Sequence, residues 1–363
     1  MVIMSRYDSN NSGAMPAGVD IKDLSLPMLT DWVAATGAKP FHAGQIFKWI
    51  YIHQVDDFNE MTDLAKPLRG RLIDRFAVTR LKKAAVEKAA DGTCKYLFGM
   101  ADGNFIESVL IPEKKRLTLC ISSQVGCAQG CRFCLTGRGG FIRHLSRGEI
   151  LAQVRDVRQD LPAPEKLTNL VFMGMGEPLA NYDNVISALA TLTDNRCGMA
   201  FSRQRVTVST AGIVPHIARL GQDTDISLAV SLNAADNRTR NRIMPINRRY
   251  PLEALIDACQ NYPLKRRRKI TFEYILIKGV NDSPEDAKRL TRLLSPSWAK
   301  INLIPFNEFA ESTFARPEAD IIDRFMDILH RRQFVTVVRA SKGGDISAAC
   351  GQLRVRAAAS MNQ

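Results

Sequence analysis

Three cysteines within eight residues are the part of this sequence best suited to bind a metal centre. Cys127, Cys131 and Cys134 form a CxxxCxxC pattern in the segment CISSQVGCAQGCRFCLTGRGGFIRHL. Cysteine thiolates hold iron–sulfur clusters, usually four per cluster, so three would leave one iron open to a small molecule. The alternative is structural zinc, which needs four protein ligands, here with Cys120 or His144 as the fourth. The three-residue gap favours the cluster over zinc.

Two further side chains could do chemistry next to such a centre. In the strand-like run FIESVLI, Glu107 shares one face with Phe105, Val109 and Ile111 by period two, where it is either a base or one half of an ion pair. The pattern alone favours the ion pair. In RLTLCIS, Cys120 falls on the more polar face, which suits a functional thiol if that face lines a barrel. Otherwise it is an ordinary buried cysteine.

Polar residues and glycines stand at the ends of several predicted strands. FMGMGEPLAN carries Gly174 and Gly176, which let backbone approach a ligand closely, and Glu177, which adds an acceptor. Hydroxyl and amide groups follow at Ser209 and in Ser231-Leu232-Asn233. Near the end of the sequence Cys350 lies in KGGDISAACGQL, where small residues on both sides leave a reactive and a structural role equally open.

These residues must be positioned by alternating strands and helices, which begin at Arg116. The predicted strands are 116–122, 167–173, 205–210, 226–232, 270–277, 299–305 and 334–339. The predicted helices are 146–160, 181–193, 213–221, 252–262, 284–294 and 317–332. Such alternation indicates βαβ units and an α/β fold with a parallel sheet, whose functional groups gather at the carboxyl ends of the strands. Six units are too few for an eight-unit barrel.

The sequence divides into several regions. We expect a disordered tail over 1–20, a helical accessory domain over 21–77, a short β extension over 78–112, the α/β domain over 113–355 and a tail over 356–363. In the helical domain, Ser25 can cap a first helix that stops before Gly37, and Thr62 can start a third that ends near Phe76. This domain either helps to hold a partner or is a packing cap.

Composition points to an anionic partner. The net charge of +13 comes from 50 Lys and Arg against 37 Asp and Glu, and the basic residues cluster in 238–249 and in KRRRK at 265–269. Such patches serve phosphate contacts, which carry no base information by themselves. No run of 18 apolar residues occurs, so we expect a cytoplasmic protein without a membrane span, and eight cysteines in 363 residues do not suggest a disulfide scaffold. A monomer is the default expectation.

The CxxxCxxC pattern after a strand resembles the radical S-adenosylmethionine (SAM) superfamily. The string from Cys120 through Phe141 and Arg143 resembles one branch, the adenine-C2 RNA methyltransferases that act on 23S rRNA and tRNA. The resemblance covers about residues 20–355 and implies a partial (βα)6 barrel, a 4Fe–4S cluster on the three cysteines and SAM. It places SAM on Gly176, Glu177, Ser209, Ser231, Leu232, Asn233 and Asn307. The family usually has His where Asn233 stands, and more often Arg where Lys342 stands.

The resemblance also implies a radical route to carbon 2 of adenine, which reacts poorly in a polar displacement of the SAM methyl group. One SAM would methylate Cys350, and a second would generate a radical on that methyl group, which adds to carbon 2 of the adenine. Cys120 would then attack the sulfur of Cys350 to release the product, leaving a transient disulfide, and Glu107 would accept the proton. An electron donor such as flavodoxin or ferredoxin would feed the cluster.

Three alternatives remain open at the level of sequence. A sister enzyme would methylate adenine C8 with the same parts, although the Pro178 that follows Gly-Glu leans towards the C2 branch. A non-catalytic zinc- or iron–sulfur-bearing RNA-binding protein would give Glu107, Cys120 and Cys350 no joint purpose. A radical SAM enzyme for a small molecule would leave the arginine clusters and Cys350 unexplained.

Overall fold

The computed structural model describes residues 18–309 and 312–339, and Cys350 and the predicted tail 356–363 lie outside this range. At the amino end, Val19–Asp20 forms strand β1, which pairs in parallel with β2 (Phe76–Ala77). The predicted tail over 1–20 therefore ends earlier than residue 20.

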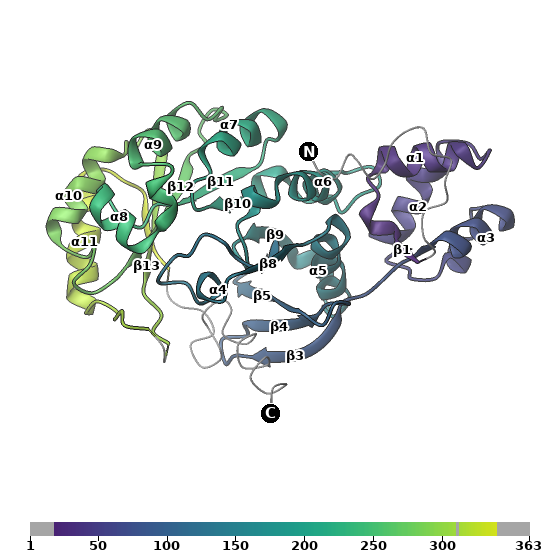
Figure 1. Ribbon diagram of the computed structural model, residues 1–363, viewed down its shortest axis with the longest axis horizontal. Helices are drawn as coiled ribbons and strands as arrows, with labels where there is room; N and C mark the ends of the chain where they lie inside the picture. The colour runs from purple at the N-terminus through teal and green to yellow at the C-terminus, as the bar shows by residue number, and fades with distance from the viewer. Residues whose placement is uncertain (1–17, 310–311, 340–363) are drawn as a thin grey trace.

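Three helices form the amino-terminal part: α1 (Leu26–Ala35), α2 (His42–Tyr51) and α3 (Lys66–Arg75). The side chain of Ser25 accepts a hydrogen bond from the backbone N–H of Met28, so it caps α1 as predicted. The third helix starts at Lys66 and not at Thr62, with a proline in its first turn, where the missing N–H costs no helical hydrogen bond. Figure 1 shows these helices at one end of the molecule.

The helical part is joined to the rest of the chain by polar contacts of helix α5 (Arg147–Gln159). The guanidinium of Arg155 is fully buried and donates to the backbone oxygens of Ile50, Gln54 and Val55. The backbone N–H of Gly148 donates to Asp23 over 2.7 Å. Since buried charged groups of this kind need their partners, these contacts fix the helical part against α5.

One ten-stranded sheet organises the remainder. Its first strands are antiparallel neighbours: β3 (Lys82–Lys88), β4 (Cys94–Gly99), β5 (Phe105–Glu113) and β6 (Arg116–Cys120). Its parallel strands continue from β6: β9 (Leu167–Phe172), β10 (Val206–Thr210), β11 (Ser227–Ser231), β12 (Ile270–Leu276), β13 (Ala299–Pro305) and β14 (Thr336–Val338). The β extension is therefore an edge of the same sheet.

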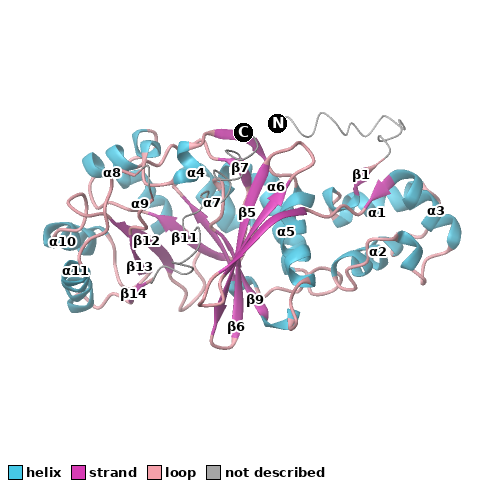
Figure 2. Cartoon of the chain, turned by 90° about the horizontal axis from the view of Figure 1, so that it is seen from below, coloured by secondary structure: helices cyan, strands magenta, loops and turns pink. Residues whose placement is uncertain are grey.

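Helices alternate with the parallel strands as the sequence predicts, and they lie around the outside of the curved sheet (Figures 1 and 2). They are α5, α6 (Tyr182–Thr193), α7 (Val214–Asp223), α9 (Leu252–Gln260), α10 (Pro284–Leu293) and α11 (Ala319–Arg331). A capping box of Ser146 and Glu149 begins α5. Within the described residues, no helix is long and apolar enough to cross a membrane.

Four short elements stand outside this alternation. Strands β7 (Gln124–Gly126) and β8 (Phe141–His144) pair around the cysteine motif and enclose α4 (Leu135–Arg138). Helix α8 (Asn237–Ile243) was not predicted. Its N-cap is Asp236, whose side chain accepts a hydrogen bond from the backbone N–H of Thr239.

The register of the sheet separates an apolar face from a polar one. Side chains of directly paired residues lie on the same face of a sheet, and successive residues alternate. The face covered by helices carries buried apolar residues such as Leu119, Leu170, Val208, Val230, Phe272 and Leu303. The opposite, concave face carries polar groups, and the functional residues predicted on the strands lie there.

Candidate active site

The three motif cysteines lie on one loop between β7 and α4. The loop is closed by backbone hydrogen bonds: Cys127 N–H donates to the oxygen of Gly140 over 2.8 Å, and Cys134 N–H donates to that of Cys131 over 3.1 Å. Cys131 is buried, while Cys127 and Cys134 are half-buried. A short β-ribbon and one helical turn thus present all three thiols from a compact segment.

The donor set of this loop fits an iron–sulfur cluster. Burial raises the pKa of each thiol, to about 12 for Cys127, and the charge of Cys134 raises the pKa of Cys127 and Cys131, so the thiols are neighbours. A raised pKa means that deprotonating these buried thiols costs free energy. Binding of the thiolates to iron offsets this cost, because the metal takes the place of the proton. Among the described residues, no three His, Cys, Asp or Glu side chains converge closely enough to hold one metal ion.

Glu177 follows β9 in a buried turn, as the sequence predicted, but both its oxygens are occupied. Oε1 accepts from the N–H of Leu179 over 3.0 Å, and Oε2 accepts from that of Ala211 over 2.7 Å. Only 3% of the residue is exposed, and burial raises the pKa of the carboxyl to about 7 against these hydrogen bonds. Glu177 therefore ties the end of β9 to the end of β10.

The glycines of this turn serve chain packing. Gly176 has φ of 100°, and a Cβ there would lie 2.5 Å from the Cβ of Gln124. A Cβ on Gly174 would lie 2.7 Å from the oxygen of Ile121. On the side that a Cβ would occupy, residues 121–124 of the chain approach these glycines. The approach of a ligand to their backbone stays a prediction.

A row of polar side chains follows the concave face across the strands. Val171 is the register partner of Cys120 on one side and of Thr207 on the other, and Ser209 lies two residues further on the same face. Ser231 is paired with Glu273, and Glu273 with Asn302. The prediction that Cys120 lies on the polar face is confirmed, and Ser209 and Ser231 share that face with it.

The pKa of the Cys120 thiol is affected both by burial and by nearby charged side chains. Burial raises the pKa of its thiol to about 11, and the guanidinium of Arg339, which follows β14, is the largest opposing influence. Lys95 lowers this pKa further, and Glu273 raises it. A cation from the last described strand end therefore favours the thiolate that a nucleophile requires.

Glu107 forms the ion pair that its strand pattern favoured. Its Oε2 lies 3.0 Å from the Nζ of Lys95 on β4, and each side chain is 1% exposed. Leu97 is paired with Glu107, and Lys95 with Val109, so the two charged groups lie on the concave face, which also carries Cys120. The carboxylate of Glu107 is therefore shielded from solvent, on the same face of the sheet as the thiol of Cys120.

Sequence reasoning missed Glu273 altogether. The residue is buried, burial raises the pKa of its carboxyl, and Arg339 lowers it. Its Oε1 has no hydrogen-bond partner among the described residues. A carboxylate in the middle of ITFEYIL breaks an otherwise apolar and aromatic strand, and this is the signal that could have found it.

The loop after β11 is held by hydrogen bonds of two buried side chains, Asn233 and Arg240. Asn233 is buried with φ of 58°, and its Oδ1 accepts from the N–H of Ile275 over 2.8 Å. Arg240, from the unpredicted α8, donates to the backbone oxygens of Ser231, Leu232 and Ala211. Arg240 belongs to the basic cluster over 238–249, but it is fully buried and has no exposed surface to offer a phosphate.

The last predicted ligand, Asn307, is half-buried just after β13. It therefore stands at a strand end, like the other predicted SAM contacts. Cys350 lies outside the described residues, so its placement against Cys120 stays a prediction.

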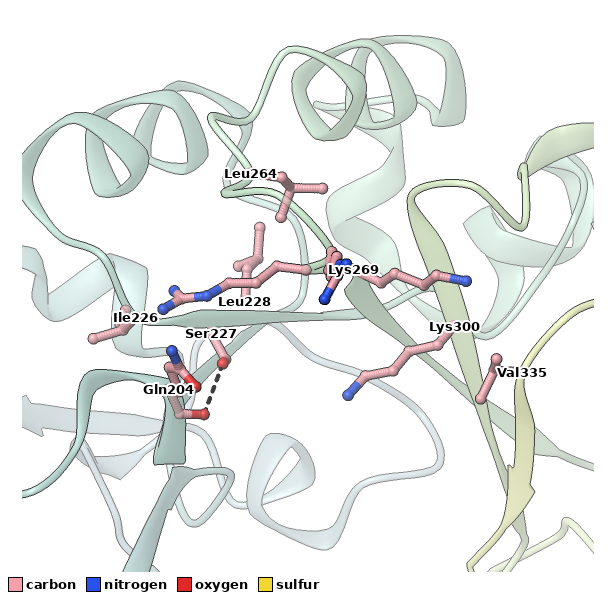
Figure 3. Close-up of a pocket in the computed structure, with 10 residues that line it drawn as sticks. Gln204, Ile226, Ser227, Leu228, Leu264, Lys269, Lys300 and Val335 are labelled. Carbon is pink, nitrogen blue, oxygen red and sulfur yellow. Dashed lines mark hydrogen bonds between the residues drawn. The ribbon is translucent and has the colours of Figure 1, made fainter.

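The two arginine-rich segments lie at opposite ends of the strands. Arg238, Arg242, Arg248 and Arg249 are exposed around α8, after the carboxyl end of β11. The KRRRK run precedes β12, at the amino ends of the strands, where it lines a pocket with Gln204, Lys300 and Val335 (Figure 3). There Lys265 and Arg268 are paired with Asp225. Only the first segment shares an end of the sheet with the cysteine loop.

The fold and the cysteine loop define a radical SAM protein. Residues 121–291 match the model of the radical SAM superfamily, and residues 19–78 match the ribosomal RNA large subunit methyltransferase N-terminal domain. A crystal structure of a radical SAM methyltransferase from Sphaerobacter thermophilus superimposes with a TM-score of 0.86 at 44% identity, covering 92% of this chain and 98% of that one.

Relatives of known name place the chain more narrowly. It is 54% identical over 343 residues to the dual-specificity RNA methyltransferase RlmN of Desulfosudis oleivorans, covering 94% of this chain and 92% of the relative. It is 53% identical over 340 residues to the protein of the same name from Geobacter sulfurreducens, covering 94% and 93%. The chain belongs to the RlmN family, and the cofactors of such proteins are a 4Fe–4S cluster and SAM.

Proposed function

We propose that this protein is a radical SAM RNA methyltransferase that methylates carbon 2 of an adenosine in 23S rRNA and in tRNA beside the anticodon. The observation that carries the proposal is the concave face, which presents Cys120 and Glu107 together with the strand-end residues Ser209 and Ser231. Relatives that share about half of their residues with this chain are named as dual-specificity RNA methyltransferases.

The residues divide into those that hold cofactors and those that act on the substrate. Cys127, Cys131 and Cys134 would hold the cluster, and SAM would lie against Gly176, Glu177, Ser209, Ser231, Leu232, Asn233 and Asn307. Bound together, cluster and SAM supply one-electron chemistry at an aromatic carbon that is neither acidic nor nucleophilic. Because Glu177 already accepts two backbone hydrogen bonds, we assign it to shaping the SAM pocket as well as to lining it.

The protein's own groups account for proton and product handling. Glu107, held by Lys95 away from solvent, is the acceptor for the proton lost from carbon 2. Cys120, as thiolate, attacks the sulfur of Cys350, and the bond from that sulfur to the methylene carbon breaks. The methylene carbon keeps the electron pair and gains a proton as the methylated base leaves, and a disulfide remains between the two sulfurs. Arg339 and Lys95 favour that thiolate. A reductant must restore both thiols before the next turnover.

The RNA must be held while its adenine leaves the folded structure. Enzymes that act on a base usually take it out of the stack into a pocket. The exposed Arg248 and Arg249 stand at the same end of the sheet as the cysteine loop, where they can contact phosphates around an inserted base. We expect KRRRK at 265–269 to contribute less, because it lies at the other end.

The methyl carrier gives a direct test. The protein is expressed under low oxygen with iron supplied, and the mass of the peptide that contains Cys350 is measured. One added methyl group on Cys350 supports the two-step transfer and excludes a non-catalytic RNA-binding protein. A bare Cys350 in a protein with an intact cluster and bound SAM contradicts the carrier role.

A further inference from the structure

The cysteine loop has an outward side that the proposed reaction does not use. Gly130 and Arg132, which flank Cys131, line a surface groove of about 650 Å³. The other walls come from Arg138 of α4, Arg242 of α8, Lys278 after β12 and Phe314 after β13. The groove is thus built from the loop that would hold the cluster and from three neighbouring segments.

The charge of this groove is of one sign. Its lining includes four cationic residues and, among the described residues, no carboxylate. Arg132 and Arg242 are exposed, and Arg138 lies over the ring of Phe309 at 5.9 Å. Lys278 pairs with Glu318 over 2.8 Å, but both side chains are more than half exposed, so solvent weakens this ion pair.

Residues that line the groove are direct neighbours of the motif cysteines. Cys131 stands between two lining residues, and the N–H of Arg138 donates to the oxygen of Cys134 over 3.2 Å. Cys131 is itself buried beside Ala211, Ala234 and Met244, against which Phe314 packs. Phe314 therefore touches both the groove and the buried layer that contains Cys131, so the groove lies next to a predicted cluster ligand.

We propose that this groove is the docking surface for an acidic one-electron carrier protein. The inference rests on the proposed function only in that a cluster held by the three cysteines needs an electron. The rate of electron transfer between proteins falls steeply with distance. The carrier must therefore dock where little of the chain covers the cysteine ligands of the cluster. The reduced carrier loses one electron and the cluster gains it, and no atom is transferred.

Charge and position favour such a carrier over RNA at this surface. Four cations around an apolar floor of Val280 and Phe314 match an acidic patch with an apolar centre, and such complementarity mainly raises the rate of association. RNA must instead deliver a base to the concave face. The pair proposed to hold it, Arg248 and Arg249, does not line the groove.

The test compares two lysines in equivalent settings. Lys278→Glu alters the groove, and Lys288→Glu on α10 is the control, because the two side chains are 53% and 54% exposed and each pairs with one exposed glutamate. Arg242→Glu is a second groove variant on a different segment. Flavodoxin is the probe: binding of its oxidised form is measured by calorimetry, and reduction of the cluster by its reduced form is followed by absorbance, with dithionite as the small reductant.

At low salt we expect each groove variant to bind flavodoxin about tenfold more weakly and to be reduced by it about tenfold more slowly. Both differences should be smaller at high salt. Reduction by dithionite and all properties of Lys288→Glu should match the unaltered protein. Unchanged flavodoxin binding and reduction in both groove variants would overturn the proposal, and a loss of tRNA affinity in the same variants, measured in a separate titration, would then assign the groove to RNA. The assay contains no RNA, so a chain that flavodoxin reduces but that methylates no RNA contradicts the proposed function alone.

Discussion

The Nζ of Lys95 lies 3.0 Å from the Oε2 of Glu107, and both side chains are buried on the concave face of the sheet. Antiparallel strands β4 and β5 bring the two groups together across a diagonal of the register. The contact holds the proposed proton acceptor in one orientation beside the layer that contains Cys120. The buried carboxylate of Glu107 is therefore stabilised by the positive charge of Lys95.

Removing one member of this pair should destabilise the protein strongly. Lys95→Met leaves the carboxylate of Glu107 buried without its cation, so the free energy of unfolding should fall by about 3–5 kcal/mol. The double variant Lys95→Met with Glu107→Leu should recover most of this loss. Denaturant titration of the three proteins measures the effect, and equal stability of the single and double variants would contradict a buried ion pair.

The thiol of Cys120 should respond to Arg339. Burial raises the pKa of Cys120 to about 11 and Arg339 opposes the rise, so the rate of alkylation should keep increasing up to about pH 11. In Arg339→Gln this profile should move to higher pH. Mass spectrometry of the peptide containing Cys120 gives the rate at each pH. Superimposable profiles for the two proteins would mean that Arg339 does not influence the thiol.

Glu177 should impose a pH dependence on stability. Burial raises its pKa from 4.5 to about 7, so between these values the folded protein binds more protons than the unfolded one. Its contribution to the free energy of unfolding therefore decreases as pH rises from about 4.5 to 7, by on the order of 3 kcal/mol. Glu177→Gln cannot ionise and should lack this component. Denaturant unfolding of the metal-free protein at several pH values tests this, and parallel curves would rule it out.

The two arginine-rich segments should differ in RNA binding. Arg248→Ala with Arg249→Ala should weaken tRNA binding and reduce its dependence on salt, because fewer counterions are released from the phosphates. Arg266→Ala with Arg267→Ala removes the same charge from exposed positions in the KRRRK run, and should change both quantities much less. Affinities at several salt concentrations decide the matter. An unchanged salt slope in the first variant argues against phosphate contacts there.

Local signals in the sequence were sufficient to predict much of the fold. Strand and helix periods predicted the parallel strands and six of the helices between them, and Ser25 and Ser146 mark helix starts as capping residues do. Period two also placed Cys120 on the polar face, which the pairing with Val171 confirms. These features depend on neighbours within a few residues, which is why they can be read from one sequence.

The rest depends on contacts between distant segments. Arg240 looked like a member of an exposed basic patch, yet four hydrogen bonds to residues 211–247 bury it. Glu177 and Gly176 were assigned to a ligand, and the structure shows that the chain itself uses part of their capacity. Glu273 and Lys95 gain meaning only once the register of the sheet is known. None of these relationships leaves a periodic trace in the sequence.

The measurement that tests the account most directly is nucleoside analysis of RNA after reaction with the cluster-loaded protein, SAM and reduced flavodoxin. Unmodified 23S rRNA and tRNA are offered separately, digested and separated by chromatography with mass detection. The account predicts 2-methyladenosine from both RNAs, and its absence when Cys350 is replaced by alanine. The appearance of 8-methyladenosine, or of no methylated adenosine from a protein that binds SAM and accepts electrons, would contradict it.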